Sequence, residues 1–324
     1  MAQIGYAAML EQFHPKELVG FCEQAEAAGF SGVMAADHVQ PWVPQQGQAS
    51  FVWSFMTAAA EHTRGDIGPG VTCPSFRSHP AIIAQAAATM AALYPSRFWL
   101  GLGSGEALNE HIVAEKWPEA SVRLEMLEEA VAILRRLWQG GDESHYGTYF
   151  EMENARIYTL PGTPPPIYVS AFGPKSIALA ARIGDGLVST KPDADLLRSY
   201  TDAGGRGPKL AQVKVCWDDD GERARDLAFH LWPTSGLEGE LSQELPTPRH
   251  FEQAVSVLKR EDVVSSFPCG RDPQPHLDAI RKYADSGYDE VYITQVGPNQ
   301  EGFLRFYERE ILPEFQRQRS MQNA

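Results

Sequence analysis

The chain reads Gly32-Val-Met-Ala-Ala-Asp37-His38-Val-Gln-Pro-Trp42 where a short apolar run stops at a carboxylate and an imidazole. Gly29 and Phe30 lead into this run, whose length and composition are typical of a buried parallel strand. In α/β folds, ligands bind at the carboxyl ends of such strands. The stretch therefore predicts an α/β fold with Asp37 and His38 at a ligand site. The alternative is a polar loop that caps the next helix.

Strand-like and helix-like segments alternate on both sides of this stretch. Strands are expected at Ile4–Ala8, Val33–Ala36, Ile67–Val71, Phe98–Leu102, Ile167–Ala171, Gly186–Ser189, Val213–Trp217 and Glu290–Thr294. Helices are expected at His14–Ala28, Ser50–Glu61, Pro80–Leu93, Val122–Trp138, Pro174–Ile183, Glu222–Leu231, Arg249–Lys259, Pro275–Ser286 and Gly302–Phe315. About eight βα steps without a strong linker favour a single (β/α)8 TIM barrel domain spanning residues 1–324. A doubly wound sheet is the alternative architecture.

Two stretches interrupt the alternation and are expected to be insertions into the barrel. Residues 143–158 include Tyr146-Gly-Thr-Tyr-Phe-Glu-Met152, where aromatic and polar residues alternate as in a β-hairpin. Residues 233–248 are rich in Gly, Pro, Ser and Glu and have weak periodicity, which predicts a long loop.

The charge and the cysteine content limit the classes of function. Lys and Arg number 28 against 42 Asp and Glu, which gives a formal net charge of −14. Nucleic acids and anionic membranes require basic surface, so neither is an expected partner. The cysteines are scattered without a C-x-x-C spacing, which favours neither a metal site nor disulfides. Reduced thiols, together with the lack of a leader-like start or a long apolar run, predict a cytoplasmic protein.

Polar and glycine residues follow several of the predicted strands. They are Gly70-Val71-Thr72-Cys73, Gly101-Leu-Gly103-Ser104-Gly105-Glu106, Ser170-Ala171-Phe172-Gly173 and Ser189-Thr190-Lys191. In a barrel these strand ends meet at one face, so together they outline a polar mouth. The loop 101–106 resembles a dinucleotide fingerprint, but its third glycine comes too early for G-x-G-x-x-G. Its glycines more simply bring backbone N–H groups close to a phosphate or a ring oxygen.

Three side chains at this mouth suit proton chemistry. His38 titrates near neutral pH, and the adjacent Asp37 can fix its tautomer. Glu106 is a candidate proton donor, although a carboxylate at that position also stabilises a helix N-terminus. Trp42 lies in a polar loop, which favours a place at the mouth over one in the core. Other histidines, among them His276, are expected at the surface or at helix ends.

Several segments resemble the luciferase-like barrel superfamily and, within it, the coenzyme F420-dependent glucose-6-phosphate dehydrogenase family. They are Glu11-Gln-Phe-His-Pro-Lys-Glu-Leu-Val19, Asp37-His-Val-Gln-Pro-Trp42, Phe76-Arg77 with His79-Pro-Ala-Ile-Ile-Ala-Gln85, Gly103-Ser-Gly-Glu-Ala-Leu-Asn-Glu110 and Gly184-Asp-Gly186. The resemblance covers essentially the whole chain. It implies an F420-dependent dehydrogenase that moves a hydride from an alcohol or sugar carbon to the deazaflavin. Because relatives are commonly dimers, it also implies a homodimer.

The resemblance implies roles for individual residues. His38 is the base for the substrate alcohol, Trp42 helps to hold the developing charge, and Glu106 protonates the reduced ring. The implied cofactor contacts are Asp37, Gly70, Val71, Cys73, Ser104, Gly105, Asn109, Ala171, Phe172 and Gly173. The implied substrate contacts are Ser189, Thr190 and Lys191. The family often has a non-prolyl cis peptide in the turn after the third strand, here between Gly70 and Val71.

Two departures from the family bear on the substrate. Members that act on sugar phosphates hold the phosphate with a Lys in the insertion and an Arg late in the chain. Here the insertion Gly236–Leu245 is acidic and has no Lys. The position that aligns with the late Arg of the family lies in Ser265-Ser266-Phe267, which has no Arg. A dianionic phosphate binds poorly beside carboxylates. An uncharged alcohol or an unphosphorylated sugar is therefore the expected substrate.

Other functions fit the same residues. One is dehydrogenation of glucose 6-phosphate, and another is a luciferase-like monooxygenase that uses flavin mononucleotide, which shares the shape of a deazaflavin. A barrel that binds a ligand without turnover is a third. The reaction direction is also open, because the same acid and base serve alcohol oxidation and the reduction of a carbonyl or an activated alkene.

Overall fold

A computed structural model of the chain describes residues 2–237 and 239–322. Its main sheet contains eight parallel strands: β1 (Gln3–Ala8), β2 (Gly32–Ala35), β3 (Asp66–Pro69), β4 (Leu100–Leu102), β7 (Ile167–Ser170), β8 (Gly186–Ser189), β9 (Lys209–Val215) and β10 (Glu290–Gln295). The strands pair in chain order, and β1 also pairs with β10. Bridges from Ile67 to Phe98 and from Thr72 to Leu102 join the β3 and β4 segments and close the sheet. The predicted (β/α)8 barrel is confirmed.

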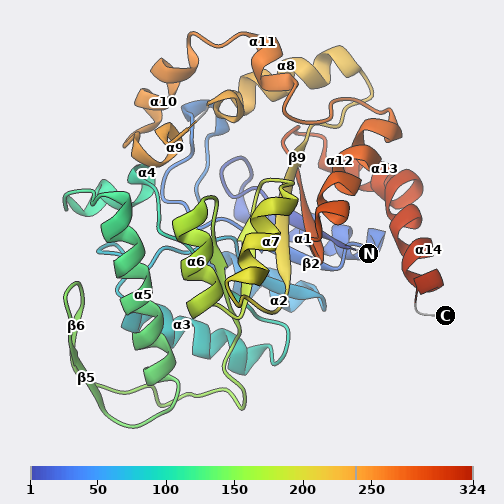
Figure 1. The fold of residues 1–324 in the computed structure, drawn as a ribbon. Helices are drawn as coiled ribbons and strands as arrows, with labels where there is room; N and C mark the ends of the chain where they lie inside the picture. The colour runs from blue at the N-terminus through green and yellow to red at the C-terminus, as the bar shows by residue number, and fades with distance from the viewer. Residues whose placement is uncertain (1, 238, 323–324) are drawn as a thin grey trace.

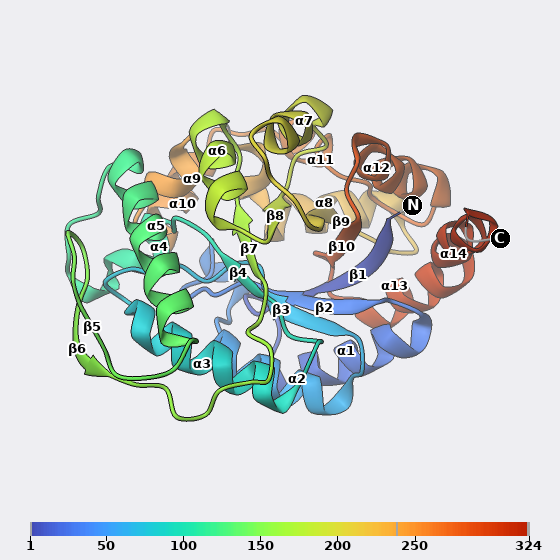
Figure 2. The ribbon, with the colours of Figure 1, turned by 60° about the horizontal axis from the view of Figure 1, so that its bottom comes forward.

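Helices surround the barrel on its outside (Figure 2). Those between successive strands include α1 (Pro15–Ala28), α2 (Val52–His62), α3 (Pro80–Leu93), α5 (Ala120–Leu137), α6 (Pro174–Ile183), α7 (Ala194–Asp202) and α12 (Pro273–Ser286). After β10 come α13 (Gln300–Phe306), a π-helical turn at Tyr307–Ile311 and α14 (Leu312–Gln322). In α1, Leu18, Cys22 and Ala25 are buried at helical spacing. The helix ends at Gly29, whose φ of 108° is left-handed and suits glycine.

The structure differs from the expectation between β8 and β9. The hydrophobic pattern predicts no helix at α7, yet Asp193 caps one there by accepting hydrogen bonds from the amides of Asp195 and Leu196. The helix has nine residues, which is too short for its periodicity to stand out. β9 begins at Lys209, before the predicted start at Val213, because Leu210 continues the buried strand toward its N-terminus.

The predicted loop at residues 233–248 is partly helical. It contains a 3₁₀ turn at Pro233–Gly236 and α9 (Leu241–Glu244), and Glu238 lies outside the described residues. The helix expected at Arg249–Lys259 ends early, as α10 (Pro248–Val255), and a separate helix, α11 (Arg260–Val264), follows the expected range. Thr247 caps α10 by accepting a hydrogen bond from the amide of His250. Short helices give too few turns for a periodic pattern, and their caps decide where they begin.

The inside of the barrel is filled by large rings set against small residues. Trp99, Tyr168 and Tyr292 pack there with Met34, Val188 and Leu210. A side chain at Gly5 would collide with the ring of Tyr292, and one at Gly68 would collide with Trp99. The interior is therefore a packed core and not a channel, which leaves the loops at the ends of the strands as the place for a ligand.

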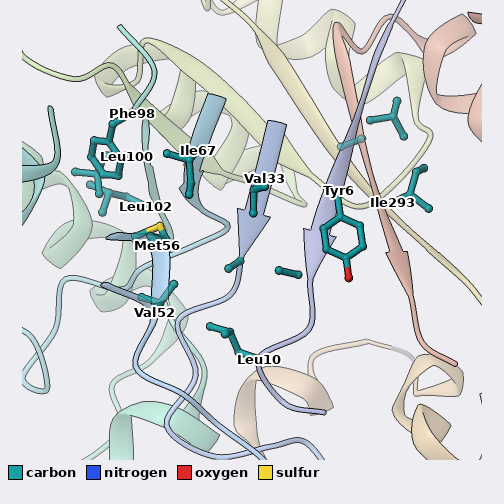
Figure 3. Close-up of a cluster of buried hydrophobic side chains, with 14 of the residues drawn as sticks. Tyr6, Leu10, Val33, Val52, Met56, Ile67, Phe98, Leu100, Leu102 and Ile293 are labelled. Atoms are coloured by element: carbon teal, nitrogen blue, oxygen red, sulfur yellow. The ribbon is translucent and has the colours of Figure 1, made fainter. Parts of the chain in front are cut away.

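A second core lies between the strands and the helices. It includes outward-facing side chains of the strand segments and side chains of α2, and Figure 3 labels Tyr6, Leu10, Val33, Val52, Met56, Ile67, Phe98, Leu100, Leu102 and Ile293. Buried inside this core, the Tyr6 hydroxyl donates a hydrogen bond of 2.8 Å to Oε1 of Gln300. Because outward and inward side chains alternate along each strand, the two cores fix which residues can face the barrel axis.

The two insertions lie in different parts of the molecule (Figure 1). The predicted hairpin is present as β5 (Glu143–Tyr146) and β6 (Glu151–Ala155), and Glu129 of α5 holds it by accepting hydrogen bonds from the amides of Thr148 and Phe150. The second insertion runs from α8 (Gly221–Leu231) to α11 and contacts α4 (Ala107–Glu110) through α9. No helix in the described part of the chain combines the length and apolar character needed to cross a bilayer.

Candidate active site

His38 lies between two glutamates at the carboxyl end of the barrel. Its Nδ1 is 2.5 Å from Oε1 of Glu11, and its Nε2 is 3.5 Å from Oε2 of Glu106. The three residues follow β1, β2 and β4, so three separate loops converge on one imidazole. The side chain of Glu11 is 4% exposed and that of Glu106 is 30% exposed. Glu11 therefore supports His38 from inside the protein, while Glu106 faces the open mouth.

The two carboxylates decide the charge of His38. Burial alone lowers the pKa of His38, because a low-dielectric interior disfavours the charged ring. The hydrogen bonds and the charges of Glu106 and Glu11 outweigh burial and raise the pKa of His38 from 6.5 to about 10. The imidazole is therefore protonated at neutral pH in the protein without ligand. It can give a proton in this state, and it can take one only after it has lost its own.

Trp42 packs edge-on against His38. The two ring centroids are 5.4 Å apart and the planes meet at 89°. On its other side Trp42 meets the ring of Phe251 in α10, with centroids 5.2 Å apart. The Trp42 amide donates a hydrogen bond to Gln46, whose own amide group donates to the carbonyl of Leu231 at the end of α8. Helices of the second insertion thus hold the Trp42 loop in place beside His38.

Asn109 connects the loop of His38 to the loop of Glu106. Its Oδ1 accepts hydrogen bonds from the amides of Val39 and Gln40, at 2.9 and 3.3 Å. Its Nδ2 donates to Oε2 of Glu106 at 3.3 Å. The side chain is buried, and these contacts set the distance between the two candidate proton carriers.

The carboxylate of Asp37 belongs to a buried ion-pair network. Arg77 lies 3.2 Å from Asp37 and 3.1 Å from Glu110, and the hydroxyl of Thr72 donates to Asp37 at 2.9 Å. Burial raises the pKa of Glu110, and Arg77 limits that rise. The network ties the loops after β2, β3 and β4 together. It occupies the carboxylate of Asp37, so the contact that fixes the tautomer of His38 comes from Glu11 instead.

Two of the predicted cofactor loops follow β3 and β4. The peptide bond between Gly70 and Val71 is cis, as the resemblance implies. The amides of Ser104 and Gly105 have no hydrogen-bond partner within residues 2–237 and 239–322, so they are available to a ligand oxygen. Cys73 is buried behind this loop, and a side chain at Gly105 would collide with its sulfur. Burial raises the pKa of the Cys73 thiol, which keeps it neutral.

The third predicted cofactor loop is the turn Ala171-Phe172-Gly173 before α6. The ring of Phe172 is 39% exposed, and nothing lies within 4 Å of the position that a Cβ of Gly173 would take. The amides of Phe172 and Gly173 both donate to the hydroxyl of Ser176, at 3.2 and 3.1 Å. The turn is thus held by its own helix and offers an open, partly aromatic surface.

The three residues predicted to contact substrate lie in different environments. Ser189 is fully buried and shares a face of β8 with Leu187, on the side of the helices. Thr190 and Lys191 are exposed at the rim. Their carbonyls accept hydrogen bonds of 2.8 and 2.7 Å from the hydroxyls of Tyr283 and Tyr288, which fix this part of the rim.

Two charged residues of the site escaped the sequence-based prediction. Glu11 follows β1 closely, and the signal was available because a polar residue directly after a predicted strand faces the mouth. Lys214 lies in β9 between two valines, and its Nζ is 4.8 Å from the centroid of the Trp232 ring. A lysine at an inward position of a barrel strand is the signal that would have found it.

The chain is similar to known proteins over nearly its full length. The sequence model of the luciferase-like monooxygenase family matches residues 1–290. A protein of Microbacterium testaceum named F420-dependent glucose-6-phosphate dehydrogenase is 36% identical over 325 residues, which are 96% of each chain. A protein of Mycobacterium avium with the same name is 35% identical over 333 residues, which are 97% of this chain and 98% of the other.

Two solved structures resemble the whole fold. The first is an F420-dependent secondary alcohol dehydrogenase in complex with an F420-acetone adduct, with a TM-score of 0.88 and 27% identity over 96% of this chain and 98% of the other. The second is the coenzyme F420-dependent tetrahydromethanopterin reductase of Methanopyrus kandleri, with a TM-score of 0.74 and 19% identity over 97% of this chain and 100% of the other. The second likeness shows the fold alone.

Proposed function

The chain belongs to the luciferase-like monooxygenase family, and from this premise we propose that it oxidises an uncharged alcohol or sugar hydroxyl with coenzyme F420. It is an F420-dependent oxidoreductase, since similar proteins named dehydrogenases of this kind cover nearly the whole chain. The observation that supports alcohol chemistry is His38, held by Glu11 on one nitrogen and facing Glu106 and the mouth with the other.

The residues of the mouth fit a deazaflavin. The amides of Ser104 and Gly105 are unpaired donors among the described residues, which suits a phosphate or a ring oxygen. The open surface at Phe172 and Gly173 suits an extended cofactor. We assign the holding of the cofactor to these residues, together with the loop that contains Gly70 and Val71. When bound, the deazaflavin supplies a hydride acceptor, which no amino-acid side chain provides.

The roles of the side chains follow from their positions. Glu11 keeps a proton on Nδ1 of His38, so Nε2 of the neutral ring is the atom that accepts the hydroxyl proton of the substrate. Trp42, fixed at a right angle to the imidazole, closes one side of this space and helps to hold the developing charge. Glu106 is the more exposed carboxylate, and we assign it the transfer of the second proton of the reaction.

The charge of His38 sets how the reaction depends on pH. Oxidation of an alcohol requires the neutral imidazole, and the pKa of His38 is raised to about 10 in the protein without ligand. Oxidation is therefore expected to speed up as the pH rises above neutral. The reverse reaction starts from the protonated ring and is favoured at lower pH.

The insertion supports an uncharged substrate. Glu244 and Gln243 of α9 bind Arg123 of α5, at 3.0 and 3.1 Å, so this arginine is engaged within the protein. In the segment that aligns with the late Arg of the family, Ser266 donates to the carbonyl of Val263 and Phe267 is buried, so neither residue supplies a cation. A phosphate would meet carboxylates on the insertion without a compensating charge from these positions.

The test of this function uses the purified protein with oxidised coenzyme F420. A panel of secondary alcohols, glucose and glucose 6-phosphate is added, and the loss of the visible absorbance of the cofactor gives kcat/KM for each. We expect turnover of one or more uncharged alcohols or sugars with a higher kcat/KM than glucose 6-phosphate. A clear preference for glucose 6-phosphate would overturn the substrate assignment, and no reduction with any compound would overturn the dehydrogenase.

The competing monooxygenase is tested by cofactor binding. Titration of the protein with F420 and with flavin mononucleotide, followed by Trp fluorescence, is expected to show tight binding of F420 alone. Tight binding of flavin mononucleotide without binding of F420 would reverse the choice. The homodimer and the cytoplasmic location stay predictions, which sedimentation and cell fractionation would test.

A further inference from the structure

Lys214 places an ammonium group inside the barrel mouth. On β9, Val213 and Val215 belong to the core between strands and helices, whereas Leu210 belongs to the core inside the barrel. By the alternation of a strand, Gln212 and Lys214 share the inward face with Leu210. Gln212 donates a hydrogen bond of 2.8 Å to the hydroxyl of Thr294 on the neighbouring strand. Lys214 stands one step nearer to the carboxyl end, where the site opens.

The ammonium group of Lys214 lacks a polar partner among the described residues. No carboxylate lies within 4.0 Å of it, and the contact that it makes is with the ring of Trp232, 4.8 Å from the centroid. A cation–π contact holds the ammonium group on one side and leaves its N–H groups unused. Lys214 is partly buried, so these N–H groups are free of the described part of the protein and available to a ligand.

Lys214 is close enough to the reacting centre to feel its charges. Burial lowers the pKa of Lys214, and the negative charges of Glu11 and Glu106 act in the opposite direction. A second link runs through the contacting ring, because Nε1 of Trp232 donates a hydrogen bond of 2.7 Å to Gln12, the neighbour of Glu11. Lys214 is therefore inward on β9 and packs on a ring that is hydrogen-bonded to the neighbour of Glu11.

We propose that Lys214 binds a second oxygen of the substrate, so that the enzyme acts on vicinal diols and polyols in preference to monohydric alcohols. This inference rests on the proposed alcohol oxidation. His38 serves the hydroxyl that reacts, and Lys214 is left to donate to a neighbouring hydroxyl. We take that oxygen to be a neutral hydroxyl, in keeping with the uncharged substrate of the proposed function.

The alternative is that Lys214 only balances the two carboxylates. In that case its removal changes the ionisation of His38 and slows every alcohol to the same extent. A specific contact slows only substrates that carry the second hydroxyl. The two explanations are separated by a pair of substrates that differ in one hydroxyl group.

The experiment compares trans-1,2-cyclohexanediol with cyclohexanol in the parent protein and in Lys214→Met, both with F420. We expect the substitution to lower kcat/KM for the diol by about 10- to 100-fold, as loss of a hydrogen bond to a charged group does, and for cyclohexanol by less than about threefold. Lys209→Met removes the other lysine of β9, which is 3.9 Å from Asp289, and serves as the matched control. Equal losses on both alcohols, with a shifted pH profile, would overturn the contact, as would no loss on either.

A binding measurement keeps this proposal separate from the proposed function. Reductive methylation of lysines is followed by mass spectrometry in the presence of F420 and of each alcohol, and it requires no turnover. The diol is expected to protect Lys214 and cyclohexanol is not, while Lys209 reacts alike in both. If no compound of the panel is turned over but the diol protects Lys214, the dehydrogenase fails and the second-oxygen site stands. Equal reactivity of Lys214 with both alcohols would overturn the site whatever the activity.

Discussion

Two histidines of this protein, His38 partly buried and His276 fully buried, are in opposite charge states at neutral pH. His38 lies at the barrel mouth between Glu11 and Glu106, and its pKa is raised to about 10. His276 lies in the first turn of α12, fully buried, and burial lowers its pKa to about 4. The protein thus keeps a charged imidazole where a proton is exchanged and a neutral imidazole in the buried face of α12.

The partners of each ring explain the difference. Nδ1 of His276 lies 3.1 Å from the hydroxyl of Tyr307, and Nε2 lies 3.0 Å from the carbonyl of Gly270. The carbonyl can only accept, so Nε2 donates to it, and Nδ1 accepts from the hydroxyl. These neutral partners satisfy a neutral ring completely and do not offset the penalty of burying a charge. Burial acts on both histidines, and only two carboxylates are strong enough to reverse it.

The largest expected effect is on catalysis. His38→Asn removes the group that exchanges the substrate proton, and we expect kcat for alcohol oxidation with F420 to fall by about 100- to 10,000-fold. His276→Gln is expected to keep kcat within about threefold, since that ring contacts Gly270, Phe306 and Tyr307 and none of the residues assigned to the site. Rates are measured by the loss of cofactor absorbance, and F420 affinity by Trp fluorescence. Similar losses in both variants would mean that the two histidines do not differ in function.

A smaller effect is expected when one carboxylate is removed. Glu11→Gln takes away a negative charge from Nδ1 of His38, so the pKa of His38 falls and its neutral form appears at lower pH. The rise of kcat/KM for oxidation should therefore move toward neutral pH, while kcat at its plateau drops by about tenfold because the ring is held less firmly. Glu17→Gln, an exposed site on α1, serves as the control. An unchanged pH profile would show that Glu11 does not set the charge of His38.

The same pair of histidines shows how far the sequence could lead. His38, Glu106 and the barrel were predictable because strand ends have a local pattern and because whole segments resemble a family. Glu11 was missed although it follows the first strand closely, because its contact with His38 depends on which loops converge in the closed barrel. His276 was expected at the surface or a helix end. It does lie near the start of α12, but it is buried.

Lys214 and α7 are two further features that the sequence-based prediction missed. β9 begins earlier than predicted, and with the start set at Val213 the inward face of this strand, and so the direction of Lys214, was not apparent. α7 depends on one capping aspartate and the 233–248 segment on short helices, for which hydrophobic periodicity carries little signal. What the sequence lacked in each case is the long-range packing that decides which side of an element is buried.

The difference between His38 and His276 can be tested further by measuring how the free energy of unfolding changes at acid pH. The pKa of His276 is about 4 in the folded protein and near 6.5 when unfolded, so between these values the unfolded chain binds more protons. Its contribution to stability is full above pH 6.5 and is lost as the pH falls toward 4. The free energy of unfolding of the parent relative to His276→Phe, which cannot titrate, should therefore shrink by about 2 to 3 kcal/mol over this range. Urea unfolding at several pH values measures it, and a constant difference would contradict the buried neutral ring.

The smallest effect is expected for a conservative change at the same place and at neutral pH. Glutamine at position 276 can still donate to the carbonyl of Gly270, but it is less able to meet the hydroxyl of Tyr307 at the same time. Loss of one neutral hydrogen bond is worth about 1 kcal/mol, so His276→Gln should be destabilised by about that amount in urea. His62→Gln changes an exposed ring that is 3.6 Å from Glu23, and it is expected to stay within about 0.5 kcal/mol of the parent. If His276→Gln and His62→Gln had the same free energy of unfolding, the two hydrogen bonds of His276 would not stabilise the fold. The difference between His38 and His276 would then rest on the carboxylates around His38 alone.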